Sequence, residues 1–296
     1  MASRSPRPPA VRKTLKLYIG GAFVRSESGR TLLAAETQGP ALSNLPRASR
    51  KDARDAVTHA RSALQGWSRA TPFLRGQILY RMAEMLQGRE ATFLTLLRGG
   101  GASEAAAKAE FEAALDVLIS YAGWCDKYDA VFGGTNPVAA PFFNVSSLEP
   151  TGVVAVFLPT RWPLLGLAAA TGAVLSGGNT GLVVAPPSAG EAALEFAEVL
   201  ATSDLPGGAW NVLTGLHDEL RDPVGGHRDI NAFVVFEDRD PATRATLQRL
   251  AADSVARVAT WPLAETLESA VSGLSNPWRG VELLETKTAW HPAGGR

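Results

Sequence analysis

The sequence predicts an α/β fold: a parallel sheet covered by helices on both faces, a preceding helical segment and a small extended sheet. From residue 152 onward, short apolar runs alternate with helical stretches, the pattern of βαβ units with right-handed crossovers. Residues 49–124 carry apolar side chains at helical spacing instead. Residues 136–150 and 280–292 are extended and contain β-favouring residues, which predicts the small sheet.

The composition fits a globular protein with a substantial core, because 46% of the 296 residues are hydrophobic and 20% are charged. Lys+Arg and Asp+Glu both number 29, so no basic field exists to attract nucleic acid or anionic lipid. We therefore expect neither a nucleic-acid partner nor a membrane. The single cysteine excludes an internal disulfide and a thiolate metal cluster, which predicts a reducing, cytoplasmic location.

The N-terminal part is expected to pack on the parallel sheet. Residues 1–14 are basic but lack the apolar stretch of a signal peptide, so we expect a disordered arm. Residues 15–135 are predicted to begin with short strands in KLYIGGAFV and TLLAAE and to continue as helices. Ser49, with Asp52 three residues later, predicts a capping box at the start of the first helix.

Three further helices are predicted before residue 125. They begin near Pro72, near Arg89 and after Ser103. The last of them has an apolar stripe formed by Phe111, Ala114, Leu115, Leu118, Ile119 and Ala122. The glycines at 99–101 are expected to end the preceding helix, since the GxxxxGK[ST] spacing of a phosphate loop is absent.

Residues 151–265 are predicted to form the parallel sheet, with strands in GVVAVFLP, TGLVVA, AWNVLTG, INAFVVF and VARVATW. The turn FLPTRWPLL follows the first of these strands. It places Arg161 and Trp162 where open α/β sheets hold ligands. Arg161 has two interpretations: a guanidinium that holds an anion beside a helix N-terminus, or an exposed charge with no ligand.

Several segments match one known family in order and spacing. They are YIGGAFV, SRKDARDAVTHARSALQGWSRATPFLRGQILYRMAEML, YAGWCDKYDAVFGG, EPTGVVAVFLPTRWPLL, GGNT and LPGGAWNVLTG. Together they resemble the aldehyde dehydrogenase superfamily, in which the last three read EPxGVVxxxxPWNFPLL, GNT and LPxGVxNVxxG. The resemblance spans residues 15–260 and the tail VELLETKTAWHP. It implies a Rossmann-like NAD(P)-binding domain, a cysteine-bearing catalytic domain, and oligomerisation strands at 136–150 and 280–292.

The chain departs from this family where the family's chemistry is performed. A cysteine thiolate attacks the aldehyde, an asparagine amide holds the oxyanion and a glutamate activates water. Arg161 occupies the asparagine position. The resemblance also implies that the catalytic domain, with its cysteine, is missing between VARVATW and the tail. Glu265 is a loose neighbour of the glutamate position and is given no role, so we expect no catalytic residue.

The cofactor contacts that the resemblance implies are degenerate; they fall on Pro159, Thr160, Val184, Gly215 and Phe236. Val184 stands where the family has a lysine for the adenosine ribose. FVVFEDRD replaces the family's Gly-Ser turn, so Phe236, Glu237 and Asp238 put bulk and negative charge near a pyrophosphate. We therefore expect no cofactor, or NAD(P) bound at most weakly.

The remaining chemistry-bearing residues are predicted to be structural. Cys125 has no neighbouring histidine and follows a helical stripe, which indicates a packed thiol. No metal is expected, because no paired ligand spacing links His59, His217, His227 and His291. A solvated turn is expected for Glu237, Asp238 and Asp240.

The leading interpretation is a non-catalytic scaffold or regulatory subunit that assembles with itself or with an active aldehyde dehydrogenase. One alternative is an NAD(P)-dependent aldehyde oxidoreductase whose partner chain supplies the nucleophile. Another is a nucleotide- or anion-binding module centred on Arg161. We also expect an apolar face where the missing domain leaves the sheet uncovered. The sequence leaves open whether residues after Trp261 pack on their own domain or on another chain.

Overall fold

The computed structural model describes residues 12–32, 43–237 and 241–293, so residues 1–11 of the predicted arm lie outside it. Within this part, one sheet has the strand order β2-β1-β7-β6-β5-β8-β9. Its parallel strands are β5 (Val153–Phe157), β6 (Thr180–Ala185), β7 (Trp210–Thr214), β8 (Ala232–Phe236) and β9 (Arg257–Trp261). The antiparallel extension consists of β1 (Leu17–Ile19) and β2 (Ala22–Val24). The predicted α/β fold is confirmed.

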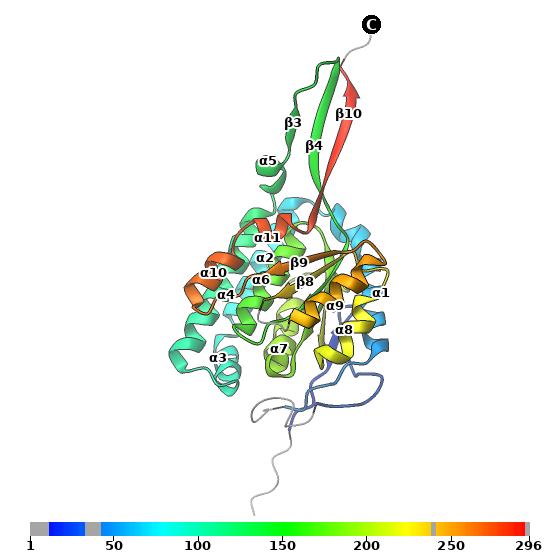
Figure 1. Ribbon diagram of the computed structural model, residues 1–296. Helices are drawn as coiled ribbons and strands as arrows, with labels where there is room; N and C mark the ends of the chain where they lie inside the picture. Colours follow the sequence, from blue (N-terminus) through cyan, green and yellow to red (C-terminus); the bar gives the residue numbers. More distant parts are fainter. Residues whose placement is uncertain (1–11, 33–42, 238–240, 294–296) are drawn as a thin grey trace, which may run out of the picture.

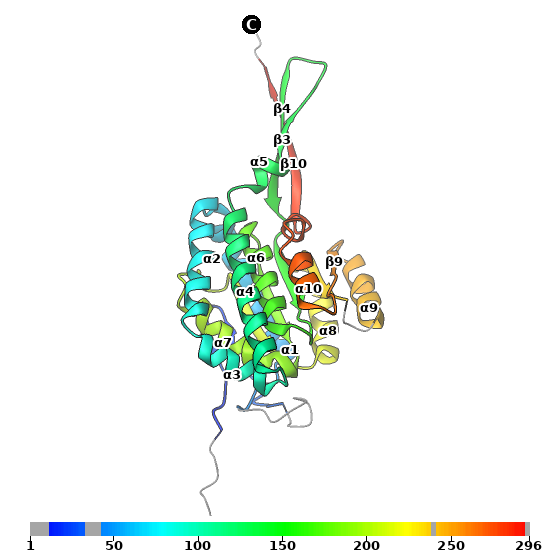
Figure 2. The ribbon, with the colours of Figure 1, turned by 90° about the vertical axis from the view of Figure 1, so that its left-hand side faces the viewer.

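Helices cover both faces of this sheet (Figure 1 and Figure 2). One face carries α1 (Arg50–Arg69), α8 (His217–Gly225) and α9 (Pro241–Ala252). The other carries α6 (Pro163–Ser176) and α7 (Gly190–Ala201), preceded by η1 (Pro187–Ala189). Outside α6 and α7 lie α2 (Pro72–Gln87), α3 (Glu90–Gly99) and α4 (Glu104–Trp124). Helices cover both faces because the central strand is apolar on both sides. Alternate residues of β5, such as Val154 and Val153, belong to separate core clusters on the two faces.

The predicted capping box starts α1. The Ser49 side chain accepts hydrogen bonds from the amides of Lys51 and Asp52, and the Asp52 carboxylate accepts one from the Ser49 amide at 2.7 Å. Asp52 is buried, and its carboxylate also accepts a hydrogen bond from the Ser26 hydroxyl at 2.7 Å. The cap therefore fixes the start of α1 and ties it to the N-terminal strands.

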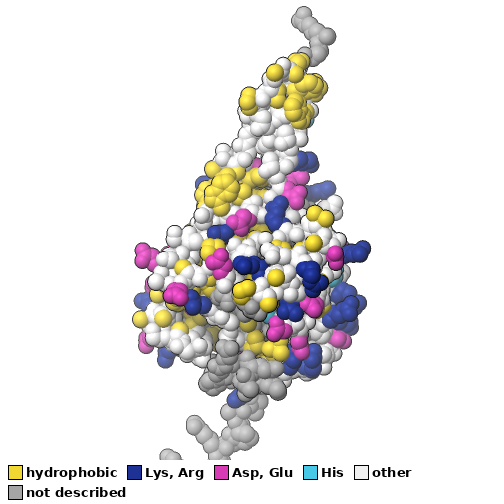
Figure 3. All heavy atoms as spheres, viewed as in Figure 1, with side chains coloured by type: hydrophobic (Ala, Val, Ile, Leu, Met, Phe, Trp, Pro, Cys, Tyr) yellow, Lys and Arg dark blue, Asp and Glu magenta, His cyan; other side chains and the backbone are white. Residues whose placement is uncertain are grey.

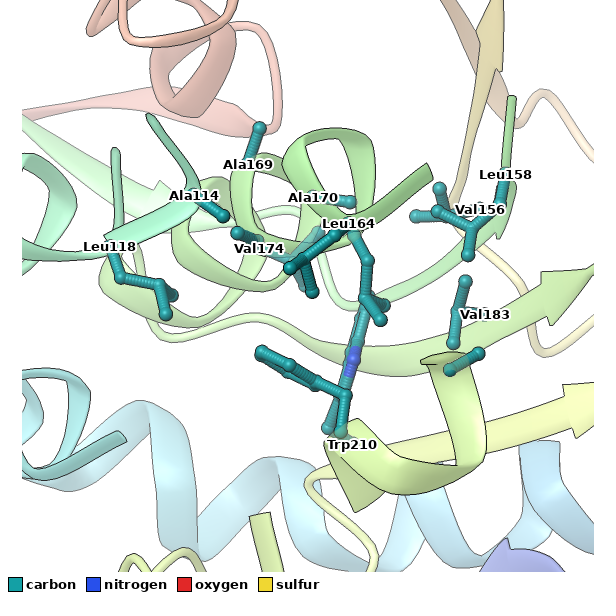
Figure 4. Packing of buried hydrophobic residues seen from close by; sticks show 14 of the residues in the cluster. Ala114, Leu118, Val156, Leu158, Leu164, Ala169, Ala170, Val174, Val183 and Trp210 are labelled. Carbon is teal, nitrogen blue, oxygen red and sulfur yellow. The ribbon is translucent and has the colours of Figure 1, made fainter. Parts of the chain in front are cut away.

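α4 packs closely against α6 near the centre of the main domain. Figure 4 shows Ala114 and Leu118 of α4 close to Ala169 and Val174 of α6, within one buried cluster. Small residues on α6 permit this close approach. A Cβ at Gly172 would lie 2.5 Å from Cδ2 of Tyr121, so only glycine fits between the two helices here.

The small sheet forms an arm that projects from the body (Figure 1). It consists of β3 (Gly134–Asn136), β4 (Phe142–Pro150) and β10 (Leu284–Pro292), and α5 (Tyr128–Phe132) lies at its base. β4 and β10 are antiparallel over their whole length, with Leu284 opposite Pro150 and Pro292 opposite Phe142. Segments far apart in the chain therefore build the arm together.

Residues 262–283 pack on their own domain. α10 (Leu267–Leu274) lies against α4 and α6, and α11 (Trp278–Val281) lies against α6. The hydroxyl of Tyr121 on α4 donates a hydrogen bond to the carbonyl of Leu274 at 2.6 Å. Among the described helices, none combines the length and apolarity that a membrane crossing requires.

Among the described residues, the carboxyl edge of the sheet does not carry the expected apolar face. In the described residues, large exposed apolar side chains lie on α2 and α4 and on the arm, including Phe73, Tyr80, Ile119, Phe143 and Trp290. Others lie at the base of the arm, on α5 and α11, and at Val255 after α9. Figure 3 shows apolar side chains at the base and at the tip of the arm. The segment of α10 and α11 covers α6 instead of leaving it exposed.

Candidate functional site

The strand order defines a crevice at the carboxyl edge of the sheet. The chain leaves β5 toward β6 on one side and leaves β8 toward β9 on the other, so the order reverses between β5 and β8. Open α/β sheets bind ligands outside the carboxyl ends of their strands at such a switch point. We call the region formed by residues 158–163 and 236–237 the switch-point crevice.

The structure brings the predicted cofactor positions to this edge, because each lies at or just after the carboxyl end of a parallel strand: Pro159, Thr160, Val184, Gly215 and Phe236. Thr160 alone among these five is exposed. The Val184 carbonyl accepts hydrogen bonds from the Leu158 amide at 3.0 Å and is 2.9 Å from Nε2 of His217. The buried positions therefore form the wall of the crevice and present few polar side-chain atoms to a ligand.

The side of the crevice at the end of β8 has a buried aromatic residue followed by an exposed acidic one. Phe236 is fully buried and stacks edge-to-face on Trp261, with ring centroids 5.7 Å apart. Glu237 follows it and is exposed, and its amide donates a hydrogen bond to the Trp261 carbonyl at 3.0 Å. Asp238 and Asp240, predicted to belong to the same acidic turn, lie outside the described residues.

Arg161 and Trp162 form the turn between β5 and α6. Arg161 is exposed, and it makes no hydrogen bond or ion pair with any described residue. Trp162 is the N-cap of α6, has a left-handed backbone with φ of 50°, and makes no side-chain cap hydrogen bond. A bulky residue in this conformation costs roughly 1–2 kcal/mol. Such strain persists where the surrounding structure holds it, which is common at functional sites.

Glu110 of α4 provides the missing cap of α6. Its Oε1 accepts hydrogen bonds from the amides of Leu164 at 2.8 Å and Leu165 at 3.4 Å. The carboxyl group is buried, with the residue 3% exposed. Burial raises the pKa of Glu110 to about 7, against the lowering effect of the two amide hydrogen bonds. Glu110 therefore accepts the hydrogen bonds of the first amides of α6, and Arg161 faces solvent beside it.

No role was expected for Glu110 from the sequence, because apolar residues surround it on α4 and charged residues are usually exposed. It precedes Ala114 by four residues and therefore lies on the buried face of the helix. This four-residue spacing to a buried alanine is the sequence feature that indicates burial of Glu110. The predicted stripe mixed two faces, since Phe111, Ala114 and Leu118 are buried whereas Ile119 is 43% exposed.

Cys125 lies away from the crevice, at the other end of α4. It is separated from Glu110 by roughly 22 Å of helix. The thiol is buried and donates a hydrogen bond to the Tyr121 carbonyl at 3.4 Å. Burial raises its pKa to about 12, and nearby Arg75 opposes this only in part. Cys125 also lines a groove of about 880 Å³ between α2 and α4, whose exposed walls include Phe73 and Tyr80.

The four histidines belong to no metal-binding cluster of the described residues. Within the described ranges, no group of three or more His, Cys, Asp or Glu side chains is arranged to hold a metal ion. His217 is stacked edge-to-face on Phe157, with ring centroids 5.3 Å apart. A packing role accounts for this contact.

Comparisons with known proteins agree on one family. Residues 23–260 match the aldehyde dehydrogenase family. The cytosolic 10-formyltetrahydrofolate dehydrogenase of Xenopus tropicalis is 29% identical over 252 residues, covering 82% of this chain and 28% of that protein. An aldehyde dehydrogenase of Aspergillus niger is 29% identical over 261 residues, covering 86% and 51%. The chain therefore spans about a quarter to a half of these relatives.

Solved structures share the fold. An aldehyde dehydrogenase from Bacillus cereus in complex with NAD+ aligns with a TM-score of 0.78 at 24% identity, covering 88% of this chain and 55% of that one. A 3,6-anhydro-L-galactose dehydrogenase in complex with NAP aligns with a TM-score of 0.78 at 22% identity, covering 84% and 52%. The predicted resemblance is thereby confirmed.

The expectation of no cofactor is wrong, because structures with this fold are complexes with NAD+ and NAP. That expectation rested on side-chain identity at five positions of the crevice. Four of those five are buried in this structure. Contact with a dinucleotide at such an edge depends largely on backbone groups and strand ends, which substitution of a buried side chain leaves in place.

Proposed function

Because the chain belongs to the aldehyde dehydrogenase family, we propose that it is a non-catalytic subunit that binds NAD(P) at the switch-point crevice and assembles through the arm. The observation that carries this proposal is the short connection between β9 and β10. β9 ends at Trp261 and β10 begins at Leu284, and residues 262–283 between them pack on α4 and α6. By the family resemblance, a catalytic domain would occupy this place in the chain.

The single cysteine and its position support the proposal that the chain is non-catalytic. Residues 262–283 contain no cysteine, and Cys125 is the one thiol of the sequence. A thiolate attacks a carbonyl, and a thiol with a pKa of about 12 is almost fully protonated at neutral pH. A buried, free thiol also fits the reducing cytoplasm, where we propose that the protein resides.

Arg161 supports the same conclusion. By resemblance it replaces the asparagine amide that holds the oxyanion of an aldehyde adduct. A guanidinium is longer, permanently charged and suited to bidentate contact with phosphate or carboxylate. At this exposed turn it fits an anionic ligand better than a neutral aldehyde.

The residues present fit the phosphates of a dinucleotide. Arg161 and Thr160 are exposed side by side at the carboxyl end of β5, and Arg161 is not engaged by any described residue. A guanidinium and a hydroxyl at this edge are suitable donors for a pyrophosphate. NAD(P)+ accepts a hydride when an active site delivers one. In this chain we propose that its binding stabilises the folded subunit by mass action.

The arm is the surface that fits a second chain. Phe143 and Trp290 near its tip are 53% and 57% exposed. The outer strands β3 and β10 also have unpaired backbone edges within the described sheet. Exposed aromatic groups on a projecting sheet are typical of a contact that another subunit covers. We propose a second copy or an active aldehyde dehydrogenase as that subunit.

Nucleotide binding is tested by calorimetric titration of the purified chain with NAD+ and with NADP+. We expect Arg161→Ala to weaken binding by roughly 10- to 100-fold, the value of a charge-assisted hydrogen bond. Glu237→Gln should tighten it about threefold, because one carboxylate is removed from the rim. Arg98→Ala, which removes an exposed arginine on α3, is the matched control. Absence of binding by the unmodified chain would contradict this part of the proposal.

Catalysis is tested with a panel of aldehydes and NAD(P)+. The purified chain should produce no NAD(P)H, and Cys125→Ala should change nothing. Turnover by the chain alone would overturn the non-catalytic assignment. The retained family fold also favours a second candidate, in which a partner chain supplies the nucleophile and this chain supplies the nucleotide. Mixing with an active homologue separates the two, because only the second candidate predicts that Arg161→Ala lowers the activity of the mixture.

A further inference from the structure

Glu110 is a buried carboxylate that supports one wall of the crevice from behind. The residue is 3% exposed, and its Oε1 accepts the hydrogen bonds of Leu164 and Leu165 at the start of α6. The N-cap residue Trp162 contributes no side-chain hydrogen bond. The first turn of α6 therefore depends on a carboxylate that belongs to another helix.

Among the described residues, no cation shifts the pKa of this carboxylate. The elements packed on α4 are α2, α3, α6 and α10, and the α6 sequence contains no charged residue. The titratable groups on the others and on the adjoining turn are Arg75, Tyr80, Arg81, Glu84, Glu90, Arg98, Glu268 and Arg161. None of them shifts the pKa of Glu110, which burial raises to about 7 and the two amides lower.

The segment held by Glu110 is strained and short of hydrogen bonds. Trp162 has a left-handed backbone, and its buried Nε1 has no hydrogen-bond partner among the described residues. Opening of the turn would relieve the backbone strain and hydrate this N–H group.

A closed turn with buried Glu110 and an open turn with hydrated Glu110 bind protons differently. The buried group binds its proton more tightly, so the closed form is favoured when Glu110 is protonated. We propose that Glu110 is a pH-responsive latch, which holds residues 158–166 against α4 when protonated and releases them when ionised. The consequence for the crevice, easier nucleotide entry as pH rises toward 7, rests on the proposed function.

Hydrogen exchange of the intact chain without nucleotide tests the latch. Protection of the amides of residues 164–168, normalised to intrinsic rates, is measured between about pH 5 and about pH 8. We expect it to fall on the order of 100-fold up to pH 7 and then to level. Glu110→Gln, which keeps an accepting oxygen and cannot ionise, should remain protected throughout. Glu112→Gln, on the exposed side of the same helix and paired with Lys108, should behave as the unmodified chain.

The outcomes are decisive for the latch. A flat protection profile in the unmodified chain overturns it, even if Glu110→Gln fails to fold. An unchanged fall in Glu110→Gln overturns it as well, because another group then titrates. Amides of β8 serve as the internal reference and should show no such fall. Since no nucleotide is present, failure of NAD(P) binding and failure of the latch are separate results.

Discussion

At the scale of residues, burial acts in the same direction on two groups of α4 with opposite consequences. It raises the pKa of Glu110 to about 7 and that of Cys125 to about 12. The carboxyl group therefore titrates at neutral pH, whereas the thiol remains protonated. One physical cause, desolvation of the charged form, makes Glu110 responsive and Cys125 inert.

The stability of the whole chain should report the titration of Glu110. Between pH 4.5, its ordinary pKa, and about pH 7, the native state binds the proton that the unfolded state has lost. The contribution is fully present below pH 4.5 and is lost as pH rises to about 7, at most about 3 kcal/mol. Urea unfolding across this range should show the loss in the unmodified chain and a smaller loss in Glu110→Gln. An equal loss in both proteins would contradict the assignment.

Removal of the cap should cost more than removal of the charge. Glu110→Ala leaves the amides of Leu164 and Leu165 without a partner in a buried place and creates a cavity. We expect a loss of about 2–5 kcal/mol in the free energy of unfolding at pH 6. Glu110→Gln retains the accepting oxygen and should lose much less. Equal losses in the two variants would show that the hydrogen bonds contribute little.

At the scale of elements, the sequence predicted the strands well and the helix faces less well. β5, β6 and β8 are continuous apolar runs, and such runs have one stable place in a two-sided parallel sheet. α4 is apolar on more than one side, so its stripe did not reveal which side meets α6. Burial of Glu110 was unpredictable because its partners, Leu164 and Leu165, are brought to it by tertiary packing alone.

The α4–α6 contact predicts a large difference between two glycine substitutions. Gly172→Ala should destabilise the chain by about 2–3 kcal/mol, because the added Cβ would lie 2.5 Å from the Tyr121 ring. Gly123→Ala on α4 meets no atom within 4 Å and should stabilise by about 0.5–1 kcal/mol through helix propensity. Thermal unfolding of both variants provides the measurement. Similar melting temperatures would contradict the close packing of these helices.

At the scale of the whole molecule, the α/β domain buries its apolar core, whereas the arm exposes aromatic side chains. α10 and α11 cover α6, and the Tyr121 hydroxyl donates a hydrogen bond to the end of α10, so the connection between β9 and β10 packs against the body. No comparable cover lies over Phe143 and Trp290 of the arm in the described chain. This contrast supports the proposal that a second chain contacts the arm.

The arm should therefore control assembly without controlling folding. Replacement of Phe143 and Trp290 by serine removes exposed aromatic groups that contact no part of the buried core clusters. We expect the dissociation constant of the assembly to rise at least tenfold, typical of aromatic hot spots, while the melting temperature of the monomer changes little. Light scattering after size exclusion, over a range of concentrations, measures the shift. Lys287→Ala, which removes an exposed charge paired with Glu149 on the same arm, is the control and should have a small effect. An unchanged assembly in the serine variant would move the subunit contact to another surface, with the groove between α2 and α4 as the next surface to mutate.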